Sequence, residues 1–203
     1  RVGRVLGGHA VALAERRGVG ERRVARQGLV GNAEGVERRP DRGFDRTVRA
    51  HACPDAPIVS GSNRFPVILF SHGLGHTNLS YRSIIEDLVS HGSVVVAVDH
   101  THGGRAVHFP DGEVVKRDNS RWFTGVDPER NRQAAMEYPR FWAEDTRQVI
   151  DMLGTSSSPI QGQIRDRIDI DRVIYAGHSF GGITAVYAAM IDRMDQGTGK
   201  LVA

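Results

Sequence analysis

Long hydrophobic runs are missing from this sequence of 203 residues. No stretch approaches the roughly 18 apolar residues of a membrane-spanning helix, so we expect a soluble protein without a transmembrane segment. Cysteine is nearly absent as well. Cys53 stands alone, which excludes an intrachain disulfide and leaves both a cytoplasmic and a secreted location open. The chain begins at Arg1 rather than at methionine, which is compatible with a removed signal peptide or with a start inside a longer reading frame.

Lysine is absent from the first part of the chain, where the basic residues are all arginines. Residues 1–53 hold 12 arginines and 6 acidic residues, a balance of +6, whereas the remainder holds 15 basic and 18 acidic residues, a balance of −3. A basic arm can bind nucleic acid or an anionic membrane surface. Here acidic residues and glycines separate the arginines, and aromatic side chains that could stack on bases are almost absent. We therefore predict no nucleic-acid partner.

The chain consists of two regions that differ in composition and in hydrophobic pattern. Residues 1–48 show neither a sustained helical period nor a clean alternation, and we interpret them as a poorly specified Arg/Gly-rich extension in which only residues 8–25 offer a short helix. From Pro54 onward, strand and helix patterns alternate as in α/β proteins, whose mostly parallel sheet is covered by helices on both faces. We place one partial α/β domain at 49–203.

Two buried strands and an intervening helix open this domain. The runs at 65–70 and 93–99 are continuously apolar, which is typical of strands buried on both faces. Between them, residues 81–91 have the spacing of an amphipathic helix that ends at Gly92. Its predicted apolar face carries Ile84, Ile85 and Leu88.

The second half is expected to contain a hairpin, two helices and a third strand. A Pro-Asp-Gly turn predicts a hairpin between strands at 106–109 and 113–115. Pro139 predicts the start of a helix over 140–152 that ends at Gly154. The inner side of this helix is expected to carry Trp142, Val149 and Leu153. A strand at 172–176, a helix at 183–194 and the beginning of a further strand at 201–203 complete the pattern.

The sequence Gly-His-Ser-Phe-Gly at 177–181 lies at a predicted strand-to-helix junction. The pattern G-x-S-x-G is common by chance, but at such a junction its glycines permit the sharp turn that exposes a serine hydroxyl above a sheet. A serine in that position becomes a nucleophile when a base accepts its proton. We therefore predict Ser179 as the nucleophile. The alternative is a glycine-rich turn that only caps the following helix.

Acyl transfer also needs donors for the negative charge that develops on the carbonyl oxygen. In a turn of this kind one donor is the backbone N–H after the serine, here that of Phe180, and another comes from a loop after an earlier strand. The loop His-Gly-Leu-Gly at 72–75 follows the strand at 65–70 and suits this role, with the Leu74 N–H as the donor. The alternative for residues 72–75 is an ordinary turn.

Three longer segments carry a resemblance to a known family. They read F-P-V-I-L-F-S-H-G-L-G, D-L-V-S-H-G-S-V-V-V-A-V-D-H and R-I-D-I-D-R-V-I-Y-A-G-H-S-F-G-G. Together they resemble the serine-dependent platelet-activating-factor acetylhydrolases over about residues 54–203. The resemblance implies the α/β-hydrolase fold, Ser179 as nucleophile and Leu74 and Phe180 as oxyanion donors, with no cofactor. It also implies a calcium-independent esterase that removes short or oxidised acyl chains from the sn-2 position of a phospholipid, and peripheral contact with a lipid surface.

The triad acid and histidine are missing after the serine. In α/β-hydrolases both follow the nucleophile in the chain, yet after Ser179 the sequence has no histidine, and its carboxylates there are Asp192 and Asp195. Both aspartates fall near the end of a predicted helix, and we interpret them as solvated helix-end residues. We place the acid and the histidine beyond residue 203 and expect this chain by itself to be inactive or nearly so.

Other interpretations remain beside this hypothesis. The protein could be a general carboxylesterase or a cutinase-like polyester hydrolase, or a truncated remnant that binds without turnover. Asp99, His100 and His102 could contribute to a metal site if an extended segment placed both rings on one side, but no second cluster accompanies them and we predict no metal. His178 is interpreted as a packing residue, because a neighbour of the serine in a tight turn points elsewhere.

Overall fold

The computed structural model describes residues 10–13, 61–108, 113–118, 127–154 and 162–196. Within the predicted extension at 1–48 it describes a single strand. Cys53 and the strand expected to begin at Leu201 lie outside the described residues.

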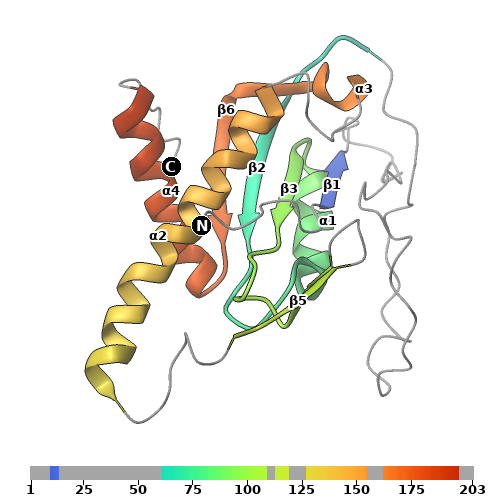
Figure 1. Cartoon of the computed structure of the whole chain (residues 1–203). Helices are drawn as coiled ribbons and strands as arrows, with labels where there is room; N and C mark the ends of the chain where they lie inside the picture. The colour runs from blue at the N-terminus through green and yellow to red at the C-terminus, as the bar shows by residue number, and fades with distance from the viewer. Residues whose placement is uncertain (1–9, 14–60, 109–112, 119–126, 155–161, 197–203) are drawn as a thin grey trace, which may run out of the picture.

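A four-stranded sheet forms the centre of the fold (Figure 1). In spatial order its strands are β1 (Ala10–Leu13), β3 (Val94–Val98), β2 (Phe65–Ser71) and β6 (Ile168–Gly177). β3, β2 and β6 are parallel, whereas β1 pairs antiparallel with β3. The continuous apolar runs correctly predicted parallel strands, because such strands are buried on both faces.

Two strands differ from the sequence expectations. The sequence predicts a short helix over 8–25, but Ala10–Leu13 is a strand because its backbone pairs with β3. β6 begins at Ile168 rather than at residue 172. Its pairing with β2 shifts register between Pro66 and Val67, and an irregularity of this kind lets a strand bend and continue.

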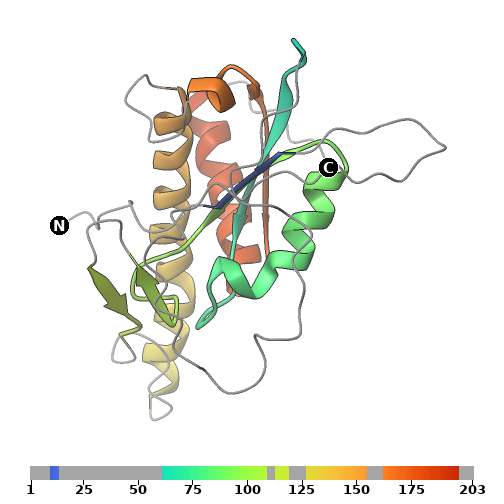
Figure 2. The same cartoon turned by 90° about the vertical axis from the view of Figure 1, so that its right-hand side faces the viewer.

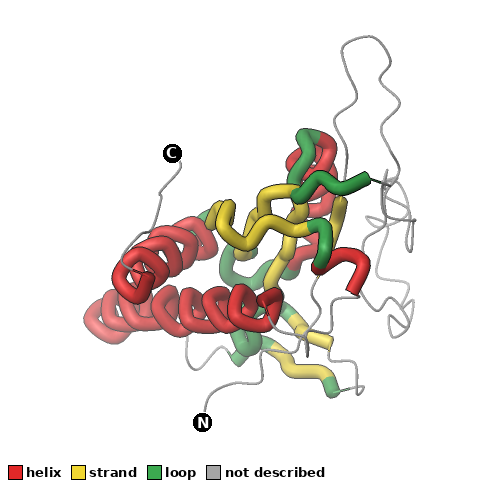
Figure 3. Tube along the Cα trace, turned by 90° about the horizontal axis from the view of Figure 1, so that it is seen from above, coloured by secondary structure: helices red, strands yellow, loops and turns green. Residues whose placement is uncertain are grey.

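Helices cover both faces of the sheet. α1 (Arg82–Ser90) lies on one side, whereas α2 (Pro128–Gly154) and α4 (Phe180–Gln196) lie on the other (Figure 2). Figure 3 shows α2 and α4 side by side from above. The described residues also include two short helical turns, η1 (Asn78–Tyr81) before α1 and α3 (Gly162–Arg165) before β6. In the described part of the chain, no helix is both long enough and apolar enough to cross a membrane.

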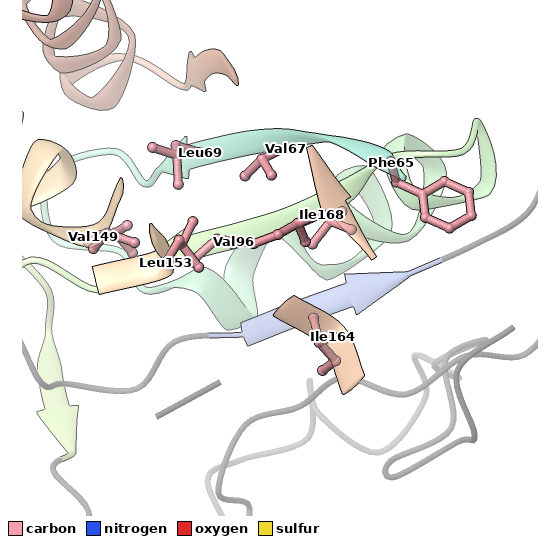
Figure 4. Packing of buried hydrophobic residues seen from close by; sticks show 10 residues of the cluster. Phe65, Val67, Leu69, Val96, Val149, Leu153, Ile164 and Ile168 are labelled. Atoms are coloured by element: carbon pink, nitrogen blue, oxygen red, sulfur yellow. The ribbon is translucent and has the colours of Figure 1, made fainter. Parts of the chain in front are cut away.

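Side chains alternate along the strands between two hydrophobic cores. The core on the α2 side joins strand residues such as Val67, Leu69 and Val96 to Val149 and Leu153 (Figure 4). The core on the α1 side contains Ile68, Phe70, Tyr81, Ile85, Val89, Val95 and Ala97.

The inner face of α1 is narrower than the sequence predicts. Ile85 and Val89, one helical turn apart, are buried, and Leu88 is partly buried. Ile84, which was predicted on the apolar face, is 48% exposed. The residue next to Ile85 in sequence points away because successive helical residues are rotated by about 100°.

α2 continues through a proline. The sequence predicts a helix start at Pro139, but the helix starts at Pro128 and Pro139 lies inside it. An interior proline removes one backbone hydrogen bond and costs about 3 kcal/mol. Burial of the apolar side of α2 offsets this cost. The predicted inner residues Trp142, Val149 and Leu153 are indeed buried, and Gly154 is the last residue of the helix.

The predicted hairpin is also present. β4 (Ala106–His108) and β5 (Val114–Lys116) form a two-stranded antiparallel sheet, and its turn at 109–112 lies outside the described residues.

Candidate active site

The ends of β2 and β6 bring the two predicted motifs side by side. Ser71, the last residue of β2, pairs with Gly177, the last residue of β6. The His178 N–H then donates to the Ser71 carbonyl at 3.2 Å. The loop at 72–75 and the turn at Ser179 therefore leave adjacent parallel strands at the same level. Ligand sites of open α/β sheets lie at this carboxyl edge.

Ser179 occupies a strained backbone position between β6 and α4. Its φ is 54°, in the left-handed region that residues with a Cβ rarely adopt. α4 begins at the next residue, and the Gly182 N–H donates to the Ser179 carbonyl at 2.9 Å. The predicted sharp strand-to-helix turn is thus present, and Ser179 is exposed on it.

Two glycines allow the turn to pack tightly. A Cβ on Gly177 would collide with the backbone of Gly181, and a Cβ on Gly181 would collide with the carbonyls of Ser71 and His72. No side chain fits at either position, so the G-x-S-x-G pattern follows from close backbone contact.

The two predicted oxyanion donors share one support. Phe180 is buried against the indole of Trp142, with ring centroids 4.9 Å apart, and Leu74 packs against this pair. Trp142 belongs to α2, so one side chain of that helix helps to hold both the loop and the turn. The structure therefore brings Leu74 and Phe180 together around Trp142.

Hydrogen bonds attach the loop at 72–75 to the segment after β3. The Gly75 N–H donates to the Gly103 carbonyl at 2.8 Å. Asp99 accepts two bonds from Asn78, one from its backbone N–H at 2.7 Å and one from its side-chain amide at 2.9 Å. Fixed loops of this kind suit preorganised donors, which need no rearrangement when charge develops.

His72, at the start of the loop, is buried and neutral. The His100 backbone N–H donates to His72 Nε2 at 3.0 Å, so Nε2 carries no hydrogen. Nδ1 therefore carries it and donates to the Gly73 carbonyl at 2.8 Å. Burial, followed by the neighbouring His100, lowers the pKa of His72 from 6.5 to about 3. Asp99 Oδ1 lies 3.9 Å from Nε2, but the neutral ring makes no ion pair with it.

A second serine lies in a buried row of polar groups. Ser71 Oγ is 3.1 Å from His100 Nε2, and Asp145 Oδ2 is 3.4 Å from His100 Nδ1. The order of groups resembles a nucleophile, a base and an acid. However, Ser71 is only 1% exposed and His100 is fully buried, so an ester has no access to this hydroxyl. The row has a structural role.

Burial also affects two carboxyl groups near the site. It raises the pKa of Asp99 from 3.8 to about 7, although the backbone N–H of Asn78 acts in the opposite direction. Burial likewise raises the pKa of Asp145 from 3.8 to about 7. Both carboxyls therefore change protonation near neutral pH.

The metal alternative depends on an extended segment that the structure does not contain. The residues after β3 form a turn in which His102 has a φ of 62°. His100 is directed at Ser71 and Asp145 instead. Within the described ranges, no group of three or more His, Cys, Asp or Glu side chains could hold a metal ion.

The other polar residues near the serine point elsewhere. His178 was interpreted as a packing residue, but it is exposed, and its Nδ1 lies 2.9 Å from the Tyr81 hydroxyl. Asp192 lies on α4 near Tyr175. Burial of Tyr175, followed by the negative charge of Asp192, raises the pKa of the Tyr175 hydroxyl. The Asp195 side chain lies outside the described residues.

Three supporting residues gave no functional signal in the sequence. Tyr81 and Asn78 fall in and around a predicted helix, and Trp142 was predicted only as a core residue. Their contacts with the loop and the turn connect elements far apart in the chain, and no local pattern encodes such contacts.

A parallel sheet with helices on both faces, and a serine at positive φ between strand and helix, define part of an α/β-hydrolase fold. The structure of a ferulic acid esterase from Streptomyces cinnamoneus is similar, with a TM-score of 0.58 and 33% sequence identity. The similarity covers 72% of this chain and 38% of that chain.

In sequence, the chain resembles the platelet-activating factor acetylhydrolases. The family model described as "Platelet-activating factor acetylhydrolase, isoform II" matches residues 44–141, which include the loop at 72–75 and end before Ser179.

Individual relatives agree with this resemblance. The platelet-activating factor acetylhydrolase of Canis lupus familiaris is 30% identical over 171 residues, which are 74% of this chain and 37% of that protein. A probable 1-alkyl-2-acetylglycerophosphocholine esterase of Arthroderma benhamiae is 30% identical over 126 residues, which are 62% of this chain and 28% of that protein. The chain spans well under half the length of these relatives.

Proposed function

We propose that the full-length protein is a serine carboxylic-ester hydrolase of the platelet-activating-factor acetylhydrolase type. Its proposed substrates are phospholipids with a short or oxidised acyl group at the sn-2 position. The observation that carries the proposal is the pairing of Ser71 with Gly177, which sets the exposed Ser179 beside the loop that contains Leu74. The names of the relatives support an acetyl ester of a glycerophosphocholine as substrate, and the resemblance to the family extends the proposal to other short or oxidised acyl groups.

The proposed reaction is acyl transfer through the serine. Ser179 Oγ attacks the ester carbonyl carbon while an imidazole base accepts its proton. The N–H groups of Leu74 and Phe180 donate to the oxyanion that forms. Collapse of this intermediate expels the lysophospholipid alcohol, which takes the proton from the imidazolium, and leaves the acyl group on Ser179. Water, activated by the same base, then releases the carboxylic acid.

We further propose that the acid and the base come from residues beyond Ala203. The His178 ring is engaged with Tyr81, and the His100 ring is engaged with Ser71 and Asp145. Neither ring is directed at Ser179. Residues 1–203 alone should therefore hydrolyse esters several orders of magnitude more slowly than the full-length protein.

A substrate panel tests the proposal. We expect the full-length protein to cleave acetyl-glycerophosphocholine at least tenfold faster, in kcat/KM, than long-chain phosphatidylcholine. Ser179→Ala should abolish hydrolysis while the circular dichroism spectrum stays unchanged. Full activity in this variant would show that the nucleophile is another residue.

A second candidate is a general carboxylesterase, which the similarity to a ferulic acid esterase favours. It would share Ser179 and the loop at 72–75 but prefer other esters. Feruloyl and p-nitrophenyl esters and a polyester film, included in the same panel, distinguish the two candidates. Absence of hydrolysis of every ester by the full-length protein would support the remnant that binds without turnover.

We also propose peripheral contact with a lipid surface, since the proposed substrate resides there. Leu79 in η1 is 56% exposed and follows the loop at 72–75. Leu79→Asp should reduce co-sedimentation with phosphatidylcholine vesicles and leave hydrolysis of soluble p-nitrophenyl butyrate intact. Unchanged sedimentation would remove Leu79 from the contact.

A further inference from the structure

We propose that the Tyr81 hydroxyl is a positioning group that sets the separation of the two oxyanion donors. The Gly73 N–H donates to Tyr81 Oη at 2.9 Å, and Tyr81 Oη lies 2.9 Å from His178 Nδ1. Gly73 immediately precedes Leu74, and His178 immediately precedes Ser179. One oxygen atom therefore contacts both the loop and the turn. The inference rests on the proposed esterase function.

The direction of one of the two bonds is fixed. A backbone N–H can only donate, so Tyr81 Oη accepts from Gly73. We assign the second bond as donation from Tyr81 Oη to His178 Nδ1, which places the hydrogen of a neutral His178 on Nε2.

The core on the α1 side holds the phenol ring in place. Tyr81 is buried and packs with Ile85 and Val95 in this core. The Phe70 ring lies 5.2 Å from the Tyr81 ring, centroid to centroid. Tyr81 is also the last residue of η1 and directly precedes α1. The position of Oη is therefore set by the hydrophobic core rather than by the loop that it supports.

The contact between loop and turn has no spare room. A Cβ built on Gly73 would lie 2.9 Å from Tyr81 Oη and 3.1 Å from His178 Nδ1. Gly73 itself is buried, so its N–H has no access to water if the phenol oxygen is removed. A buried unpaired amide is costly. The loop would then shift to find another partner and carry the Leu74 N–H with it.

Tyr81 acts from the side of the sheet opposite Trp142. Trp142 packs with the side chains of Leu74 and Phe180. Tyr81 Oη instead contacts the backbone N–H of Gly73 and the ring of His178. Removal of the Tyr81 hydroxyl alone should leave both hydrophobic cores intact, but the N–H groups of Leu74 and Phe180 should no longer be held at a fixed separation. Small displacements of catalytic groups can reduce rates by two orders of magnitude.

Tyr81→Phe in the full-length protein tests the proposal. We expect kcat on a short-acyl ester to fall about 10- to 100-fold, because displacement of a donor costs less than its complete removal, which lowers kcat by about 100- to 1000-fold, while KM changes less than twofold. The matched control is Tyr187→Phe, which removes a phenol hydroxyl from α4, where the ring lies beside Arg140. This control should retain kcat. A Tyr81→Phe variant with kcat within twofold of wild type overturns the proposal.

Changes at His178 test the same bond from its other end. His178→Asn keeps an acceptor near the place of Nδ1 and should retain most of kcat, whereas His178→Leu should lose as much as Tyr81→Phe. The double variant Tyr81→Phe/His178→Leu should be no slower than either single variant, because both remove one connection. Fully additive losses, or equal rates in the Asn and Leu variants, would overturn the proposal.

Nitrogen-15 NMR of the histidine rings provides a readout that does not depend on turnover. In wild type, His178 should show a single tautomer with hydrogen on Nε2, and Tyr81→Phe should convert it to a mixture. The His178→Asn spectrum identifies the signal. A His178 tautomer that is the same with and without the hydroxyl contradicts the inference. If wild type cleaves no ester but shows the tautomer shift, the proposed function fails and the connection through Tyr81 stands.

Discussion

The indole of Trp142 lies flat on the imidazole of His100, with ring centroids 4.2 Å apart and ring planes inclined by 5°. The same indole meets the rings of His72 and Phe180 edge-on, at 5.1 and 4.9 Å. Gly103 leaves room for it, because a Cβ there would collide with the indole. One side chain of α2 therefore fills the space between the strand ends and the turn at Ser179.

Removal of this indole should damage stability and the candidate site together. We expect Trp142→Ala to lower the free energy of unfolding by about 3–5 kcal/mol, the usual cost of deleting a buried tryptophan. Phe141→Ala is the matched control. Phe141 is the residue next to Trp142 in sequence, but its side chain is 56% exposed, so this substitution should change the free energy of unfolding by less than about 1 kcal/mol. Urea unfolding measures both. Equal losses would contradict the role of Trp142 as the shared support.

The close contact between the turn and β2 predicts opposite effects at two adjacent glycines. Gly181→Ala should destabilise the protein by about 3 kcal/mol, since the new Cβ would meet the carbonyls of Ser71 and His72. Gly182→Ala should be neutral or stabilise by up to about 1 kcal/mol, because its Cβ would lie 3.5 Å from the Gly177 carbonyl and alanine favours helix. Thermal unfolding of the two variants gives the comparison. A harmless Gly181→Ala would show that the turn is looser than described.

The strain at Ser179 predicts a gain of stability when its Cβ is removed. A residue with a Cβ at a φ of 54° is disfavoured relative to glycine. Ser179→Gly should therefore be more stable than Ser179→Ala by about 1 kcal/mol. Both variants should lose hydrolysis in the full-length protein. Denaturant unfolding of the pair isolates the backbone effect, and equal stability would mean that the turn relaxes without its side chain.

The buried carboxyl of Asp145 predicts a specific dependence of stability on pH. Burial raises its pKa to about 7 in the folded protein against 3.8 as the ordinary value. The folded protein therefore binds more protons between these values, so the contribution of Asp145 to stability falls as pH rises from about 4 to about 7. Asp145→Asn should raise the free energy of unfolding at pH 8 by up to about 4 kcal/mol relative to wild type, and should change it little at pH 4.

Two other groups and one control complete this experiment. Because the pKa of Asp99 is also raised to about 7, the stability of Asp145→Asn should still fall as pH rises toward 7. The lowered pKa of His72 acts in the opposite direction and makes stability rise with pH between about 3 and 6.5. Asp151→Asn removes the same charge from an exposed position on α2. A gain at pH 8 that also appears in Asp151→Asn would point to net charge rather than burial.

Local sequence patterns predicted the elements that carry the candidate site. The apolar runs gave β2 and β3 because a parallel strand between two layers of helices needs apolar side chains on both faces. The glycines around Ser179 gave the turn because no other residue fits there. Both signals lie within a few consecutive residues and need no knowledge of distant partners.

Long-range packing overrode local signals elsewhere. Pro139 reads as a helix start, yet α2 passes through it because the buried face of the helix continues on both sides. Ala10–Leu13 forms a strand because it pairs with β3. Propensity is a weak preference, and contacts between distant segments outweigh it.

The sequence by itself determined the class of fold, the serine at the turn and the loop that faces it, since each depends on the order of neighbouring residues. Only the tertiary structure decided that Ser71 ends beside Gly177, that Trp142 supports both Leu74 and Phe180, and that the Tyr81 hydroxyl connects Gly73 to His178. The first and last of these relationships join segments more than a hundred residues apart, and the geometry of all of them exists only once the sheet and both cores have formed.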